Sequence, residues 1–286
     1  MSTRLLLVIA HFFKPDEKAQ YSSTNARMRQ ARAAVLEQTL AQWRSLYDAP
    51  QTLDIAQRSF VRTPTPPITL DVVVLVNADH HLLSRALIER YRLKIQNVDA
   101  PNPRMLPFAA HRVMANLADQ YDVFVYSEDD LLMLDAQWLH KRQAFEAAMG
   151  PMRLMQANRY ELNPRARCLK TYVDGDLVHR ATQAHFDRLP DQAELAHSYL
   201  DQPVPLVRAR NPHAGFFALS ARQLRHWMAQ PHFMDLDSSF ISPLESAASL
   251  GLLKTFSIYK PAAPMQSHFE IRHLDTKFSS MSLPEI

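Results

Sequence analysis

The feature that most constrains the fold is a short apolar segment that ends in three consecutive carboxylates. Residues 122–126 read DVFVY, a run too short for a helix and rich in Val, Phe and Tyr. That pattern is typical of a strand buried on both faces. After Ser127 the chain continues with Glu128, Asp129 and Asp130. The sequence therefore predicts a buried strand with an acidic cluster at its carboxyl end.

The three carboxylates repel one another, and no basic residue stands among them. Such a cluster is costly at the rim of an apolar strand unless a positive charge lies close by. A hard divalent cation such as Mg²⁺ or Mn²⁺ is the usual partner, because it takes oxygen ligands and keeps positions open for substrate phosphates. The alternative is a solvated acidic turn that starts the next helix. The position favours a site, since open α/β sheets bind ligands at the carboxyl ends of their strands.

Two other predicted strands also end in polar residues. The strand expected over residues 5–10 is followed by His11, and the strand expected over 70–76 is followed by a cluster that contains Asp79. Both fit the ligand-side edge of a sheet, although Asp79 could equally cap a helix expected over residues 81–96. Residues 59–69 are rich in proline and are expected to form a loop.

A helix expected over residues 25–46 carries Arg32 near its start, together with Arg27 and Arg29. Basic residues oppose the helix dipole there, which hints at an anion nearby; solvated arginines on an exposed face are the alternative. Further along, Gly215 precedes two phenylalanines and suggests a close approach of the backbone. A helix start at Ser242, Pro243 and Glu245 has the spacing of a capping box.

Composition excludes several classes of protein. The chain has 286 residues, 47% of them hydrophobic, a net charge of +3 and one cysteine. It can bury a large core, offers no basic run for a nucleic-acid partner, and cannot form an intramolecular disulfide or a cysteine-based zinc site. A single cysteine fits a reducing compartment, so we expect a cytoplasmic protein. No stretch approaches the roughly 18 apolar residues of a membrane span, which leaves peripheral membrane association open.

Only four glycines occur, at positions 150, 175, 215 and 251. Glycines so far apart can form neither a phosphate loop nor a dinucleotide fingerprint. A phosphorylated ligand would therefore need a metal on the acidic triplet, helped by Arg and Lys, to balance its charge.

Predicted strands alternate with helices, which indicates an α/β fold with a mixed, mainly parallel sheet flanked by helices. In that order of segments the chain resembles the GT-A class of glycosyltransferases, which are Rossmann-like and use a nucleotide-sugar donor and usually a divalent metal. The matching segments are LLLVIAH, DVVVLVNAD, FVYSEDD as an Asp-x-Asp-type metal motif, NPHAGFFALS, SPLESAA and SHFE. The resemblance implies a single compact domain, with a donor-binding half over residues 1–157 and an acceptor-side half over 158–286.

The resemblance also implies roles for individual residues. Asp130 would bind the Mn²⁺ or Mg²⁺ ion, with His268 completing the metal site and His273 as the second choice. Glu128 would face the donor ribose or a metal-bound water, with Asp129 beside it. The nucleotide pocket would be lined by His11 and Asp79.

Glu245 would be the general base that takes the proton from an acceptor hydroxyl, if the reaction inverts the anomeric centre. Its alternative role is the capping box itself. The acceptor would be a glycan or another hydroxyl compound, in surface-glycan synthesis. Two other functions stay open: a metal-dependent nucleotidyl- or phosphotransferase, and a non-catalytic protein that binds nucleotide sugars.

Overall fold

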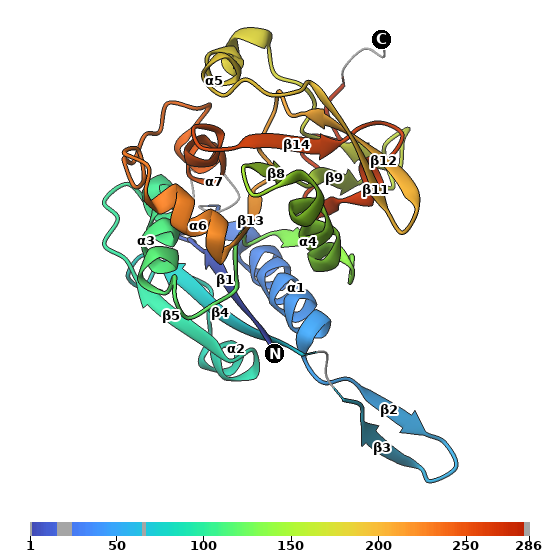
Figure 1. The fold of residues 1–286 in the computed structure, drawn as a ribbon. Coiled ribbons are helices and arrows are strands. Elements are labelled where there is room, and N and C mark those ends of the chain that lie inside the picture. The colour runs from blue at the N-terminus through green and yellow to red at the C-terminus, as the bar shows by residue number, and fades with distance from the viewer. Residues whose placement is uncertain (1, 16–24, 65–66, 283–286) are drawn as a thin grey trace.

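A five-stranded sheet forms the centre of the computed structural model, which describes residues 2–15, 25–64 and 67–282 (Figure 1). Its order is β13–β6–β1–β4–β5. The four strands from β6 to β5 are parallel, and β13 runs antiparallel to β6. The bounds are β1 Thr3–Ala10, β4 Ile68–Val76, β5 Leu93–Asn97, β6 Val123–Glu128 and β13 Phe216–Ser220. The predicted α/β class with a mainly parallel sheet is confirmed.

Helices cover both faces of this sheet, which explains why its strands are continuously apolar (Figure 1). Alternate residues of β1 enter two different cores: Leu5 and Leu7 pack in the core that includes α1, and Leu6 and Val8 pack in the core that includes α3 and α6. The helices are α1 Arg29–Tyr47, α3 Ala109–Asn116, α4 Trp138–Met149, α6 Ala221–Met228 and α7 Pro243–Leu253.

Two four-stranded sheets lie beside the central one, in the orders β10–β9–β15–β7 and β11–β12–β14–β8. Their strands are β7 Leu131–Leu132, β8 Arg153–Met155, β9 Asn158–Leu162, β10 Lys170–Tyr172, β11 Glu194–Tyr199, β12 Gln202–Arg208, β14 Ser257–Pro261 and β15 Glu270–His273. Each of the three large sheets combines strands from before and after residue 157. The two predicted halves therefore interleave.

The helix expected over residues 81–96 is wrong. Helix α2 spans only Arg85–Arg90, Ser84 rather than Asp79 caps it, and β5 follows. Arg92 has a positive φ of 49°, a conformation that no helix continues through. Pairing of Leu93 with Val72 then adds a strand that the sequence analysis missed.

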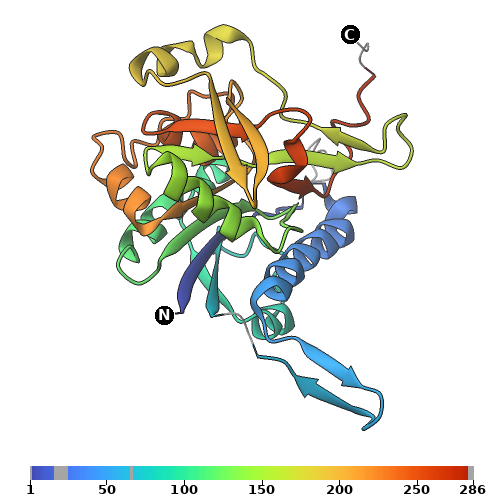
Figure 2. The same cartoon turned by 45° about the vertical axis from the view of Figure 1, so that its right-hand side comes forward.

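The loop expected over residues 59–69 is wrong for its first four residues and for its last two, since β4 begins at Ile68. Strand β3, Ser59–Arg62, pairs with β2, Gln51–Asp54, in a hairpin that projects from the body of the molecule (Figures 1 and 2). Pro64 and Pro67 lie outside this hairpin, where they remove none of its ladder hydrogen bonds.

The remaining elements are short: η1 Ala26–Met28, η2 Pro103–Phe108, η3 His179–Ala181, α5 Gln183–Arg188 and η4 Gln266–His268. Among the residues described, no helix has both the length and the apolar character needed to cross a membrane.

Candidate active site

The sheet topology brings several polar segments to the carboxyl end of β6. In the register of β1 with β6, Ala10 lies opposite Glu128, so His11 lies next to the acidic triplet. Strand β13 enters from the other side, and the Gly215 carbonyl accepts the N–H of Glu128 at 2.8 Å. The acidic cluster predicted from the sequence therefore lies at the ligand-side edge of a parallel sheet.

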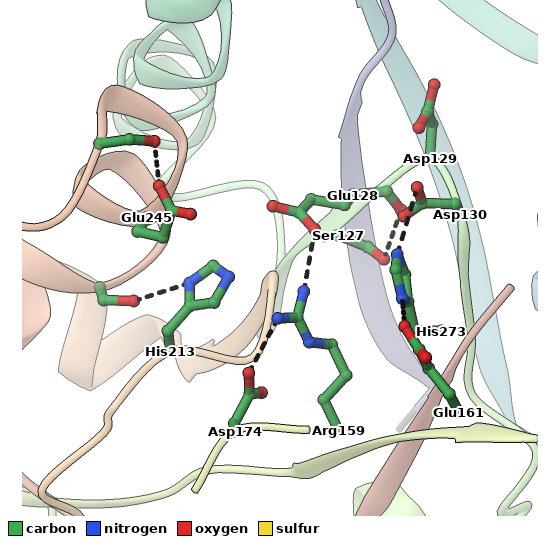
Figure 3. Close-up of polar contacts among 12 residues, drawn as sticks. Ser127, Glu128, Asp129, Asp130, Arg159, Glu161, Asp174, His213, Glu245 and His273 are labelled. Atoms are coloured by element: carbon green, nitrogen blue, oxygen red, sulfur yellow. Dashed lines mark hydrogen bonds and ion pairs between the residues drawn. The ribbon is translucent and has the colours of Figure 1, made fainter. Parts of the chain in front are cut away.

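Glu128 is held between a glycine and an arginine, and Figure 3 shows its contact with the arginine. An added Cβ on Gly215 would stand only 2.3 Å from Glu128 Oε2, which is the close approach that the sequence suggested. The Arg159 guanidinium lies 3.6 Å from the same oxygen. Burial raises the pKa of Glu128 to about 7 against the opposing charge of Arg159, and Asp130 and Glu245 add to the rise.

Asp129 is buried and fully occupied by the protein itself. Its carboxylate lies 2.5 Å from His11 Nδ1 and accepts a hydrogen bond from Arg32 at 2.6 Å. His11 Nε2 accepts the N–H of Leu82, so the ring proton sits on Nδ1 and is donated to Asp129. His11, predicted to line a nucleotide pocket, is completely buried and supports Asp129.

Asp130 is paired on one oxygen and free on the other. Oδ2 accepts a hydrogen bond from Arg32 at 3.0 Å and lies 3.6 Å from His273 Nε2, whereas Oδ1 is buried without a hydrogen-bond partner among the described residues. Burial pushes the pKa of Asp130 upward, but His273 and Arg32 outweigh it and hold the pKa below its ordinary value.

Strand register decides which histidine meets Asp130. In β15, His273 pairs with Leu131, the residue directly after the triplet. His268 lies before β15 begins, and its ring packs on Tyr199 at 5.5 Å. The structure thus brings His273 to Asp130 and gives His268 other neighbours.

His273 is also oriented from behind. Its Nδ1 lies 2.9 Å from Glu161 Oε1, a completely buried carboxylate on β9 (Figure 3). Burial lowers the pKa of His273, but the contacts with Asp130 and Glu161 prevail and raise it to about 9. Glu161 was not singled out from the sequence, since no local motif links it to a strand 110 residues later.

Arg32 supplies a positive charge that the sequence analysis could only hint at. Its guanidinium bridges Asp129 and Asp130, and the two carboxylates raise its pKa above the ordinary value against the effect of burial. The hint of an anion near the start of this helix is therefore explained by the acidic triplet.

Glu245 and Asp79, the two remaining predicted site residues, lie outside the acidic triplet. Glu245 is half-buried in the first turn of α7 and close enough to Glu128 to raise its pKa. The predicted capping box is absent: the Ser242 hydroxyl donates to the Glu245 carboxylate instead of accepting a backbone N–H. Asp79 is exposed just beyond the end of β4.

A second charged cluster, also missed from the sequence, adjoins Glu128 through Arg159 (Figure 3). Arg159 donates to Asp174 at 2.8 Å. The buried Lys260 donates to the His213 carbonyl at 2.7 Å, and burial lowers its pKa to about 8. His213 is itself buried, which holds its pKa well below the ordinary value.

The side chains at this site provide only part of the ligand set that a metal ion needs. Within residues 2–15, 25–64 and 67–282, no three His, Cys, Asp or Glu side chains are grouped to hold an ion. Asp130 nevertheless offers an unpartnered buried oxygen, and His273 has the carboxylate support that metal-binding histidines receive. Two ligands suffice for a hard cation that also binds substrate phosphates.

Comparison with known proteins gives distant structural likenesses. The sequence matches no protein-family model and no curated protein. Solved structures of S. aureus TarS resemble the chain. One has 11% identity and a TM-score of 0.42 over 98% of this chain and 38% of that one. The TarS 1–349 complex with UDP-GlcNAc gives 10% identity and 0.43 over 99% and 62%. The chain thus spans less than two thirds of these proteins, and a likeness at this level carries no functional inference.

Proposed function

We propose that this chain is a glycosyltransferase that moves a sugar from a nucleotide-sugar donor to an acceptor hydroxyl with the help of a divalent metal ion. One observation carries the proposal: the acidic triplet lies at the ligand-side edge of a parallel sheet, and the buried Asp130 Oδ1 has no partner among the described residues. A buried carboxylate oxygen without a partner is costly and marks a place for a ligand.

Asp130 and His273 would hold the ion, with Arg32 and Glu161 keeping the two ligands in place. Because the pKa of His273 is raised to about 9, the ion would have to displace the proton from its Nε2 on binding. When bound, Mn²⁺ or Mg²⁺ would stabilise the negative charge that develops on the departing nucleoside diphosphate. Because the described residues offer two ligands at this site, we expect the ion to bind firmly only together with the diphosphate.

The chain's own residues would serve the sugar and the acceptor. Glu128 is fixed by Gly215 and Arg159 at the edge of the site, where it could orient a sugar or ribose hydroxyl. Glu245 lies across from it and is the candidate for taking the acceptor proton. If the reaction retains the anomeric configuration, Glu245 would only position the sugar.

The test is a thermal-shift screen of nucleoside diphosphates and nucleotide sugars with and without Mn²⁺, which includes UDP and UDP-GlcNAc. We expect stabilisation that requires nucleotide and metal together, because each completes the other's site. Asp130→Asn should abolish the effect of the metal while leaving the fold intact. Stabilisation by neither ligand, alone or combined, would overturn the proposal.

Product analysis separates the proposed reaction from its main rival. A glycosyltransferase releases a nucleoside diphosphate, whereas a nucleotidyl- or phosphotransferase built on the same carboxylates would release pyrophosphate or a monophosphate. A protein that binds nucleotide sugars with metal but turns none over would support the non-catalytic alternative.

A further inference from the structure

The β2–β3 hairpin exposes an unusual amount of apolar surface. Leu53 is 54% exposed, Ile55 81%, Phe60 68% and Val61 53%, all within nine residues. The two strands pair only with each other, and the hairpin projects from the body in both views (Figures 1 and 2). Clusters of exposed apolar side chains on soluble surfaces mark sites that contact another molecule or a membrane.

The strand register places these side chains all around the hairpin. Leu53 pairs with Phe60 on one face, Val61 pairs with Thr52 on the other, and Ile55 lies in the connecting turn. A protein groove would cover one face. Apolar groups on both faces and in the turn, where Asp54 and Arg58 stand beside Ile55, instead suit surroundings that enclose the hairpin and are partly polar, as the interfacial layer of a membrane is.

One basic residue, Arg62, follows the apolar ones toward the body. Gln51 pairs with Arg62 on the same face as Leu53 and Phe60, one step closer to the base. Two residues along a strand span roughly 6.6 Å. The polar layer of one membrane leaflet is about 5–8 Å thick. A hairpin that enters only the interfacial layer would thus hold Arg62 at the level of the lipid phosphates and keep Asp54 and Arg58 in polar surroundings.

A cavity of about 480 Å³ opens at this position. It is lined by Arg62 together with Arg44 and Arg92, and also by Asp48. The Arg44 guanidinium donates hydrogen bonds to backbone carbonyls, and Arg92 donates one to Asp48. Arg62 makes no ion pair with any residue in the described part of the chain, so its charge is available to a phosphate.

We propose that the β2–β3 hairpin is an anchor that inserts its tip into the surface of an anionic membrane, with Arg62 at the cavity binding a lipid phosphate. The charge of the hairpin agrees: Arg58 and Arg62 outweigh Asp54, whose carboxylate accepts the N–H of Gln57. Anionic leaflets attract each exposed arginine near their surface.

A second copy of the chain is the competing occupant. A standard interface buries roughly 800 Å² on each partner. Four side chains on a two-stranded arm offer less than that, and their distribution on both faces would leave some of them uncovered in a dimer. The lipid surface therefore accounts for more of the observed pattern.

The test is flotation of the whole protein with vesicles of phosphatidylcholine, with and without phosphatidylglycerol. We expect binding that requires phosphatidylglycerol. The double variant Leu53→Ser/Phe60→Ser should weaken it more than about tenfold. Arg62→Gln should weaken it about fivefold. The matched control Leu200→Ser removes a leucine that is even more exposed than Leu53 from the β11–β12 turn and should change nothing.

A fluorescent reporter shows whether the tip enters the lipid. The chain's own tryptophans, Trp43, Trp138 and Trp227, are at most 1% exposed, so Phe60→Trp adds the one tryptophan that lipid can reach in the described chain. Its emission should shift to the blue on anionic vesicles and be quenched by brominated lipid. Equal binding to both vesicle types would overturn the role of Arg62. Absence of vesicle binding would overturn the anchor. A sedimentation mass that also falls in the Leu53→Ser/Phe60→Ser variant would then establish a dimer.

Discussion

Substitution of Gly215 by alanine tests whether the backbone of β13 holds the acidic triplet in place. Gly215 has a φ of +64°, in the left-handed region that favours glycine. The new Cβ would also stand 2.3 Å from Glu128 Oε2 and 2.7 Å from its Cδ, distances that no real pair of such atoms keeps. Gly215→Ala must therefore adopt a strained backbone and push the Glu128 carboxylate away from Arg159.

The two effects have separate magnitudes. A left-handed conformation costs an alanine about 1–2 kcal/mol. Forcing extra atoms into a packed site costs about 1–3 kcal/mol more. We expect Gly215→Ala to lower the free energy of unfolding by roughly 2–5 kcal/mol, and to reduce transfer activity because Glu128 is displaced.

Urea unfolding in a double-mutant cycle with Glu128→Ala isolates the clash. Removal of the Glu128 carboxylate should reduce the cost of Gly215→Ala by about 1–3 kcal/mol and leave the backbone strain. Gly150→Ala is the control: Gly150 also has a positive φ of 84°, but nothing lies within 4 Å of its Cβ position. Its cost should be the same in both backgrounds. Equal costs of Gly215→Ala with and without Glu128 would refute the close approach.

Three further predictions follow from buried charges. Arg32→Met should destabilise the protein by about 3–5 kcal/mol in urea unfolding, since it removes the arginine that bridges two buried carboxylates and leaves Asp129 and Asp130 with only their histidine contacts; retention of full stability would contradict the pairing. Glu161→Gln should weaken nucleotide-dependent metal binding about 10–100-fold by loosening His273, and an unchanged metal affinity would exclude this supporting role. Burial lowers the pKa of His111 to about 4 in the folded protein. As the pH falls from about 6.5 to 4, the unfolded chain takes up a proton at this histidine before the folded protein does, and stability is lost. His111→Gln should recover about 3 kcal/mol of that loss, whereas the exposed His140→Gln should recover none.

The sequence predicted the sheet better than the site. Buried strands such as β1 and β6 were recognisable because both of their faces are covered, which leaves a continuous apolar run. The same physics placed the acidic triplet at a strand end. Strand β5 was missed because it is mostly exposed and follows a short helix, so its pattern resembled a longer helix.

The partners of the triplet depend on pairings between distant segments. The register of β15 with β7 brings His273, rather than the predicted His268, to Asp130, and no local sequence pattern encodes that register. Arg32 reaches the triplet from a helix nearly 100 residues earlier. The hairpin was not predicted, because prolines closely follow β3 and residues 59–69 were therefore expected to be a loop.

The most direct test of the central claim is a crystal structure with Mn²⁺ and the nucleoside diphosphate that stabilises the protein best, recorded at the manganese absorption edge. We expect one anomalous peak bonded to Asp130 Oδ1 and His273 Nε2 and to oxygens of the diphosphate. A peak at His268, or a diphosphate bound at the triplet without any metal, would contradict the account.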